Sequence, residues 1–581
     1  MFSTEPITPS ESSEFSDAIA KYDQEPPSTN VYYFGYAKEY FPSCRACVLG
    51  QTDKQIDKRL NDKLISGSDF RANDFEDYIH SHDAVDVIDV IDEDEPNSKR
   101  LRLRSNGSTF GPVSKKMFID AMEVDQITDI SLNHSPIASF DHSMWLLMKN
   151  VAHLSLVGCH LEIVPDELKL FTNLQSLNLG YNQIRSIPEW LGSLSHLKSL
   201  SLDGNRLTSL PDTICDLIHL EYLTIGTNEI SYLPEKFGRL TKLKTFDASF
   251  NKLNEIPDSF GSLNSLEIIE LGRNQIEKMP KSLAGLSNLI ILDFSDNNLE
   301  KLPNSVGFSG TIKNIHLDNN SLYELPEWFN DLPNLVKFTC KCNKLQGEAL
   351  SPNFLMNSKN LQEINFNGNL INTLPETFSS FEKLVFLELG SPLMFPERRP
   401  DLKNGNRLRT LPVQFGLYLS NLMELRIDEN DLDSLPEHFG IGLINLRKLN
   451  LYHNNLTQLP DSICSMKNLE ECILSYNGLK ELPENLGDLV NLKLLRLDCN
   501  ELDKLPHSFS KLCNLTHLDL YGNKFNHYPE ILLKLEKIKY IGMQAGDFES
   551  DEGLTEADGQ TMDTKCEQNF PENYANTDIT W

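Results

Sequence analysis

Hydrophobic residues recur at fixed positions over most of the chain. Residues 197–217 read LKSLSLDGNRLTSLPDTICDL, and residues 220–240 read LEYLTIGTNEISYLPEKFGRL, with the same residue classes 23 positions later. The alternation of Leu200 and Leu202 with polar neighbours predicts a short strand that has one buried face. One such unit cannot bury its own leucines. The pattern therefore predicts an array of units that stack on one another.

An asparagine and a proline also return in each unit: Asn205 is matched by Asn228, and Pro211 by Pro234. The asparagine stands where the chain turns away from the strand, so its amide can pair with backbone groups that the turn leaves unpaired. The proline fixes an extended start for the return path. The asparagines form a predicted ladder at positions 182, 205, 228, 251, 274, 297, 320, 343, 369, 406, 430, 454, 477, 500 and 523.

The shared phrase, LxxLxLxxNxLxxLPxxxxxL, resembles the leucine-rich repeat. The resemblance implies an α/β solenoid, a leucine-rich-repeat horseshoe with a parallel concave sheet and about 16 repeats of mostly 23 residues. We place this solenoid at 125–544, because 127–137 looks like a degenerate first copy and EKIKYIGMQ looks like a last strand. The flanks predict a largely disordered N-terminal region with short motifs, 1–124, and an acidic disordered tail, 545–581.

The exposed strand positions on the concave face are the candidate binding residues, since the leucines are committed to the core. Asp247, Glu270 and Asp293 occupy the same position in successive strands, which places them about 5 Å apart, where like charges repel. They predict a docking site for a basic protein surface; the alternative is an ordinary solvated sheet. The candidate residues are Asp203, Asp247, Glu270, Asp293, Asp296, Asp318, Arg426 and Arg496. A contrasting basic patch is expected from Arg426, Arg447, Lys448, Lys493 and Arg496.

Two irregularities interrupt the period. The interval between Asn343 and Asn369 is 26 residues, and an insertion stands near 391–405. Insertions in solenoids lie in loops on one face, often the binding face. The insertion is either a tolerated loop or an interface loop whose anchors are Met394, Phe395, Arg398 and Arg399.

Two short motifs stand before the array. VDVIDVIDEDE, at 85–95, resembles a SUMO-interacting motif, a β-branched segment that adds as a strand to another protein's sheet. Its core residues are Val85, Val87, Ile88 and Val90. KRLRLR, at 99–104, resembles a nuclear-import signal, and the competing interpretation is a clasp onto the preceding acidic run. Its basic residues are Lys99, Arg100, Arg102 and Arg104.

Composition narrows the function classes. A formal net charge of −31 argues against nucleic-acid binding, and no apolar run is long enough to span a bilayer. Eleven scattered cysteines suit a reducing compartment, so we expect a cytoplasmic or nuclear location. Cys44 and Cys47 form a lone CxxC without a second pair, so neither a metal nor another cofactor is expected. No catalytic motif stands out, and the sequence predicts a protein without enzymatic activity.

The 23-residue phrase with LPxxxxxL resembles intracellular leucine-rich-repeat proteins of the Ras group, among them a scaffold that joins a Ras-family GTPase to a protein phosphatase. The resemblance implies a non-catalytic interaction scaffold in intracellular signalling, with a globular partner on the concave face. The phosphatase-docking motif of that scaffold has no clear match, since SKKMF at 114–118 approximates it poorly. The alternative is a nuclear adaptor or ubiquitin-ligase substrate receptor that contacts SUMO through 85–95.

Overall fold

The computed structural model describes residues 87–92, 99–104, 127–135, 137, 142–308, 310–347, 349–393 and 403–543. All of them lie in one compact unit, Ala84–Trp581. The four predicted insertion anchors, at positions 394, 395, 398 and 399, lie outside the described residues, as does Val85.

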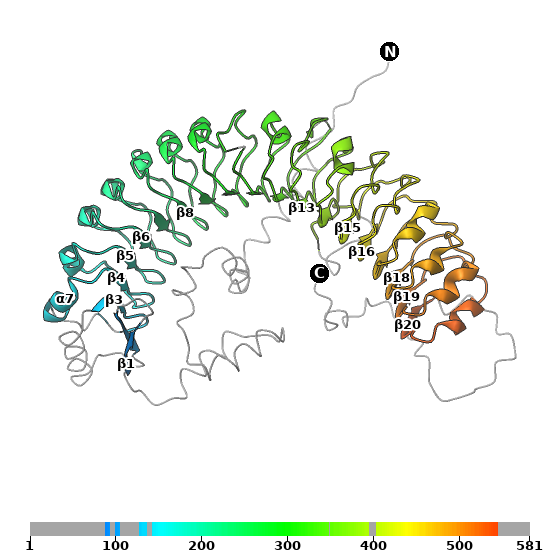
Figure 1. The fold of residues 1–581 in the computed structure, drawn as a ribbon, viewed down its shortest axis with the longest axis horizontal. Coiled ribbons are helices and arrows are strands. Elements are labelled where there is room, and N and C mark those ends of the chain that lie inside the picture. The colour runs from blue at the N-terminus through cyan, green and yellow to red at the C-terminus, as the bar shows by residue number, and fades with distance from the viewer. Residues whose placement is uncertain are drawn as a thin grey trace, which may run out of the picture. The chain divides into compact units, whose positions relative to one another are not determined.

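Each repeat contributes one short strand to a sheet whose neighbouring strands are parallel and follow the order of the chain from β3 to β20. Figure 1 shows the strands side by side on the inner side of the curved stack. The strands are β3 (Ile127–Ser131), β4 (His153–Ser155), β5 (Ser176–Asn178), β6 (Ser199–Ser201), β7 (Tyr222–Thr224), β8 (Thr245–Asp247), β9 (Ile268–Glu270), β10 (Ile291–Asp293), β11 (Asn314–His316), β12 (Lys337–Thr339), β13 (Glu363–Asn365), β14 (Phe386–Glu388), β15 (Glu424–Arg426), β16 (Lys448–Asn450), β17 (Glu471–Ile473), β18 (Leu494–Arg496), β19 (His517–Asp519) and β20 (Tyr540–Gly542).

Short 3₁₀ helices form the outer rim of the stack (Figure 1). Several start directly after the repeat proline, as at Pro211, whose φ of −69° and ψ of 150° are the extended geometry predicted for it. The 3₁₀ helices are η3 (Asp166–Leu170), η4 (Glu189–Ser193), η5 (Asp212–Asp216), η6 (Phe237–Arg239), η7 (Asp258–Ser262), η8 (Lys281–Gly285), η9 (Glu327–Asn330), η10 (Glu376–Ser379), η12 (Asp461–Ser465), η13 (Leu486–Asp488), η14 (His507–Lys511) and η15 (Glu530–Lys534). This parallel solenoid is the leucine-rich-repeat architecture predicted from the sequence.

The core lies between the sheet and the rim and runs through the whole stack without interruption. Leu200 and Leu202 of one repeat are 1% and 0% exposed, which confirms the buried strand face read from the alternation. Phenylalanines add aromatic contacts between repeats: the rings of Phe237 and Phe260 stack with centroids 5.9 Å apart. Each repeat therefore depends on its neighbours for burial.

The asparagine ladder is present as predicted. The Asn228 amide nitrogen donates to the carbonyl oxygens of Leu202 and Ile225, both at 3.0 Å, and its amide oxygen accepts from the Leu207 nitrogen at 3.0 Å. The preceding residue, Thr227, has a φ of 53°, a left-handed conformation that non-glycine residues seldom adopt. Each ladder asparagine thus links its own repeat to the preceding one and holds a strained turn at the same time.

At its N-terminal end, the sheet continues beyond the strand of the degenerate first repeat. Strand β1 (Val87–Asp92) pairs antiparallel with β2 (Lys99–Arg104), and β2 pairs parallel with β3. The short helix α7 (His142–Met148) follows β3 and buries Trp145 and Met148 against the core. The two N-terminal motifs therefore lie in adjacent strands of one hairpin.

The structure shows how the solenoid accommodates the 26-residue interval and the insertion near 391–405. In the 26-residue interval, Phe354 and Leu355 are 1% and 0% exposed, so the extra residues extend the core. The insertion leaves the stack after β14, where the Ser391 nitrogen donates to Asp428 at 3.2 Å, and the chain is held again where the Asn404 nitrogen donates to Glu429 at 2.7 Å. The following repeat therefore holds both ends of this loop.

Candidate protein-binding surface

Three carboxylates form a column across the concave sheet. Asp247, Glu270 and Asp293 are the last residues of β8, β9 and β10, and the strand register places them directly opposite one another. Their side chains are half-buried. Within the described part of the chain, no lysine or arginine lies within 4.0 Å of any of the three. We call these residues the acidic column.

Burial makes the acidic column hard to ionise. It raises the pKa of Asp247 and Asp293, and it raises the pKa of Glu270 to about 8, with a further contribution from the neighbouring charges of Asp247 and Asp293. Hydrogen bonds oppose this effect at Asp247, which accepts from the Ser249 nitrogen at 2.8 Å. Glu270, in the middle of the column, therefore bears the largest share of the mutual repulsion.

The next residue along the same row of the sheet is His316, which the register places opposite Asp293. Burial lowers the pKa of His316 to about 4, so the imidazole is neutral at physiological pH. Its Nδ1 is 3.0 Å from the Thr339 hydroxyl. The column therefore gains no positive charge from this neighbour.

Asp203 and Asp318 lie two residues beyond their strands and flank the acidic column. Asp203 accepts hydrogen bonds from the Ser201 hydroxyl at 2.9 Å, the Gly226 nitrogen at 2.8 Å, and the Thr224 hydroxyl. Burial, then the charge of Asp247, raises the pKa of Asp203 to about 6; burial does the same for Asp318. The structure thus brings these two carboxylates to the column.

Asp296 lies in the turn that precedes the ladder residue Asn297, and, besides burial, its charge contributes to the raised pKa of Asp293. It has a φ of 53°, accepts from the Asn319 amide at 2.9 Å, and lies 3.6 Å from Arg273 Nε. Its charge is therefore balanced within the turn.

Apolar side chains border the acidic column on the neighbouring row of the sheet. Tyr222 and Ile268 occupy the first positions of β7 and β9; Tyr222 is 38% exposed and Ile268 is half-buried. A partner that meets the carboxylates can also bury these side chains.

The arginines predicted as a contrasting patch are paired inside the chain. Arg426 Nη1 lies 3.3 Å from Glu388, and Arg426 Nε lies 3.5 Å from Asp428. Arg496 Nε lies 3.5 Å from Asp498, and its Nη2 lies 3.8 Å from Asp519. These two arginines are thus each held between two carboxylates, whereas Arg447 and Lys493 of the predicted patch line a groove.

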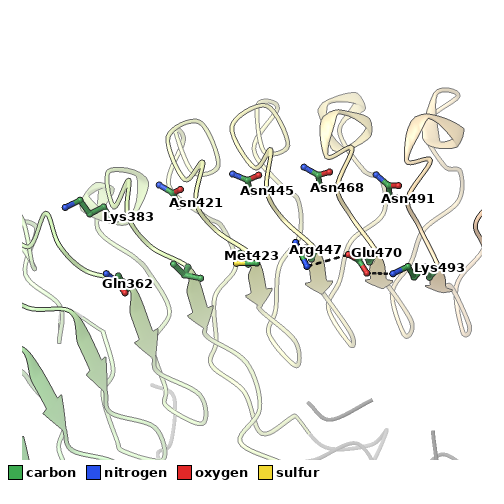
Figure 2. Close-up of a pocket in the computed structure, with 11 residues that line it drawn as sticks. Gln362, Lys383, Asn421, Met423, Asn445, Arg447, Asn468, Glu470, Asn491 and Lys493 are labelled. Carbon is green, nitrogen blue, oxygen red and sulfur yellow. Dashed lines mark hydrogen bonds and ion pairs between the residues drawn. The ribbon is translucent and has the colours of Figure 1, made fainter. Parts of the chain in front are cut away.

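A groove of about 660 Å³ crosses the repeats of the C-terminal half (Figure 2). One wall is formed by residues that directly precede strands: Gln362, Val385, Met423, Arg447, Glu470 and Lys493. The other wall is a row of asparagine amides from Asn421, Asn445, Asn468 and Asn491, continued by Lys383. The sequence predicts Arg447 and Lys493 as part of a basic patch, but it does not predict the groove or its row of asparagines.

The asparagines of this groove form a second ladder. The Asn445 amide nitrogen donates to the Ser420 carbonyl at 2.9 Å, and Asn468 donates to the Ile444 carbonyl at 2.8 Å. Each bond joins a repeat to the one before it. The sequence signal is an Asn-Leu pair directly before the strand phrase, as at Asn445 and Asn468.

Other kinds of site are not found in the part of the chain that the structure describes. There, the His, Cys, Asp and Glu side chains form no group suited to hold a metal ion. None of the described helices has the length and apolar character needed to cross a membrane.

Comparison with known proteins places the fold among the leucine-rich-repeat solenoids. Residues 150–274 match the model of a leucine-rich repeat region, and residues 420–479 match that of a leucine-rich repeat. No curated protein sequence matches the chain.

Solved structures resemble the solenoid over most of its length. A leucine-rich-repeat protein of Leptospira interrogans is 27% identical, with a TM-score of 0.54, over 70% of this chain and 94% of that one. The Arabidopsis receptor kinase HAESA, solved in complex with the peptide hormone IDA and the co-receptor SERK1, is 26% identical with a TM-score of 0.54, over 70% of this chain and 72% of its own. The Drosophila Toll–Spätzle complex, at 19% identity and a TM-score of 0.54 over 82% and 74%, shares the fold alone.

Proposed function

We propose that this chain is a non-catalytic scaffold that binds a globular protein on its concave face through the acidic column. The observation that carries the proposal is the set of three half-buried carboxylates in register, with no cation in the described chain within ion-pairing distance. Ionised carboxylates at these three positions destabilise the folded chain, because burial and mutual repulsion both oppose their ionisation. A basic partner surface removes both penalties.

The partner surface that fits has arginine or lysine side chains beside an apolar patch. The cations pair with Asp247, Glu270 and Asp293, and the apolar patch covers Tyr222 and Ile268. Exclusion of water strengthens the charge pairs, and the apolar contacts add affinity. The HAESA complex supports this use of the fold, since that related solenoid binds a peptide hormone and a co-receptor.

We further propose that this scaffold acts in intracellular signalling, a role supported by the Ras-group form of the repeat phrase. A Ras-family GTPase or a phosphatase is the expected partner, and the expected location is the cytoplasm or the nucleus. The test is quantitative mass spectrometry of proteins that co-purify with the full chain and with a chain lacking residues 1–83, which retains β1 and β2. A GTPase or phosphatase captured equally by both supports the proposal.

The binding face is tested by charge reversal. Replacement of Asp247, Glu270 and Asp293 by Lys should reduce capture of such a partner at least about tenfold, because each cation pair becomes a repulsion. The matched control reverses three exposed aspartates on the outer rim, Asp212→Lys, Asp258→Lys and Asp461→Lys. Equal capture by the column variant and the control variant would reject the site.

A second function, a nuclear adaptor or ubiquitin-ligase substrate receptor, is favoured by one observation. Among the described strands, β1 pairs only with β2, which leaves its second edge available for strand addition. Purified SUMO titrated onto the chain should shift the backbone NMR signals of 87–92 if that edge is used. Unchanged signals at saturating SUMO, with nuclear location unaffected by Lys99→Ala and Arg100→Ala, would remove this alternative.

A further inference from the structure

The groove of the C-terminal half has an excess of positive charge, unlike the chain as a whole. Arg447 Nη1 lies 3.9 Å from Glu470, and Lys493 Nζ lies 2.5 Å from the same carboxylate. One carboxylate is thus shared by two cations. Lys383 adds a third cation, and its amine donates to the Asn360 amide oxygen at 2.7 Å. In a chain of net charge −31, such a groove favours an acidic occupant.

The shape of the groove favours an extended segment. Figure 2 shows Arg447, Glu470 and Lys493 in a row along one wall and the asparagine amides in a second row that runs parallel to it. The groove crosses the repeats from the one that contains β13 to the one that contains β18. A peptide that lies between the two rows meets cations on one side and amides on the other.

The chain itself contains a segment of the required charge. Residues 547–578 hold ten aspartates and glutamates against one lysine, a formal net charge of −9. This segment follows β20, and Lys493 directly precedes β18, two strands away, or about 10 Å at ordinary strand spacing. Three or four extended residues cover that distance, so the remainder is long enough to follow the groove. The acidic column, at β8 to β10, repels the same segment.

We propose that the acidic C-terminal segment, residues 547–578, binds in the groove lined by Lys383, Arg447 and Lys493. Its carboxylates pair with the groove cations, whose charge Glu470 alone does not neutralise. The bound segment covers the side of the stack where strands β13 to β18 begin and leaves the acidic column open. This inference stands without the proposed partner of the column, because it rests on a different surface.

Zero-length carbodiimide cross-linking of the full chain, followed by peptide mapping, tests the contact directly. The reagent joins a lysine amine to a carboxylate that touches it. Cross-links from 547–578 should concentrate on Lys383 and Lys493 and decrease as NaCl is raised. Lys244 is the internal reference, since it also precedes its strand and pairs with Glu221 at 2.7 Å. It should give few such cross-links.

Two variants separate binding from chance contact without removing either reporter lysine. Arg447→Glu should lower the cross-link yield at Lys383 and Lys493 about fivefold, and Glu470→Gln should raise it, because the internal competitor is gone. Lys244→Glu is the matched control and should change nothing. Circular dichroism confirms that each variant folds.

Three outcomes would overturn the proposal. One is cross-links spread evenly over surface lysines, Lys244 included, with no response to Arg447→Glu. Another is cross-links to Lys493 that come from residues 1–86 instead of the C-terminal segment. The last is cross-links that form only between two chains, detected by mixing isotope-labelled and unlabelled protein, which would assign the groove to a second copy.

Discussion

At the scale of single residues, the repeat is defined as much by its asparagine as by its leucines. Most ladder asparagines follow a residue in the left-handed region, such as Tyr181, Thr227 or Phe250, with φ values of 53–55°. Such backbone costs on the order of 1–2 kcal/mol for a non-glycine residue. Four hydrogen bonds from one amide hold it in place. The residue before the ladder asparagine can therefore vary in type, whereas the asparagine itself cannot.

The repeat that contains β4 shows what a residue that replaces the ladder asparagine must do. Cys159 stands where an asparagine is expected, and its thiol still donates to the Leu132 carbonyl at 3.1 Å. A cysteine has no amide oxygen, and the nitrogen that would donate to it, that of Ile137, donates to the Ser135 carbonyl at 2.8 Å. The thiol thus keeps the donor role of the amide, and a backbone carbonyl takes over its acceptor role.

Replacement of a ladder asparagine in the middle of the stack should be costly. Asn228→Ala leaves the Leu207 nitrogen and the Leu202 carbonyl without their partner in a buried site, so the free energy of unfolding should fall by about 2–4 kcal/mol. Denaturant unfolding followed by circular dichroism measures this loss. Asn298→Ala, at an exposed position whose single 3.5 Å bond is weak, is the matched control. A similar loss in both variants would contradict the role given to the ladder.

At the scale of elements, the rim is packed as tightly as the sheet. The 3₁₀ helices of adjacent repeats approach so closely that a Cβ added at Gly487 would lie 1.8 Å from the Ser508 carbonyl oxygen. The Gly487 nitrogen also donates to the Ser508 hydroxyl at 2.9 Å. The glycine is therefore required by the close approach of η13 and η14.

Gly487→Ala should consequently push these two helices apart and lower the free energy of unfolding by about 1–3 kcal/mol. Gly478 is the matched control, because a Cβ there would be 3.6 Å from its nearest neighbour, an ordinary contact. Gly478→Ala should be neutral or slightly stabilising. Thermal unfolding of both variants makes the comparison, and equal Tm values would show that the rim can relax.

Strands, ladder and core could be predicted because each depends on residue classes at a fixed period. The same period predicts that Asp247, Glu270 and Asp293 are neighbours, since one repeat advances the sheet by one strand. The strand phrase, which resumes after the insertion, also sets Glu388 beside Arg426, although the pairing with Asp428 depends on side-chain reach. The pairing of β1 with β2 lies outside the period, so the repeat could not predict it; the sequence suggested it only as a clasp of 99–104 onto the preceding acidic run.

At the scale of the whole molecule, charge is distributed unevenly along the solenoid. The acidic column occupies β8 to β10, while Arg426 and Arg496 are each held between carboxylates further along, and the groove carries surplus cations. Net charge opposes compaction throughout, because like charges repel. The cost is concentrated where burial is added to repulsion, at Glu270.

The acidic column should therefore make stability fall as pH rises. The pKa of Glu270 is about 8 in the folded chain against an ordinary 4.5, so between these values the folded state binds the proton and the unfolded state has released it. Stability is lost across this window because ionisation is easier in the unfolded chain. Glu270→Gln removes that dependence. The variant should match the wild type near pH 4.5 and exceed it at pH 8 by about 4 kcal/mol.

Thermal unfolding at both pH values measures the difference, and Glu267→Gln, three residues earlier, directly before β9 and outside the column, is the control. A partner bound to the column should reverse the trend, since its cations favour the ionised carboxylates. Its affinity should thus rise from pH 5 to pH 8, and Glu270→Gln should weaken that rise. If the variant gains stability at pH 8 while binding is unchanged, the column is a strained feature of the fold that no partner uses.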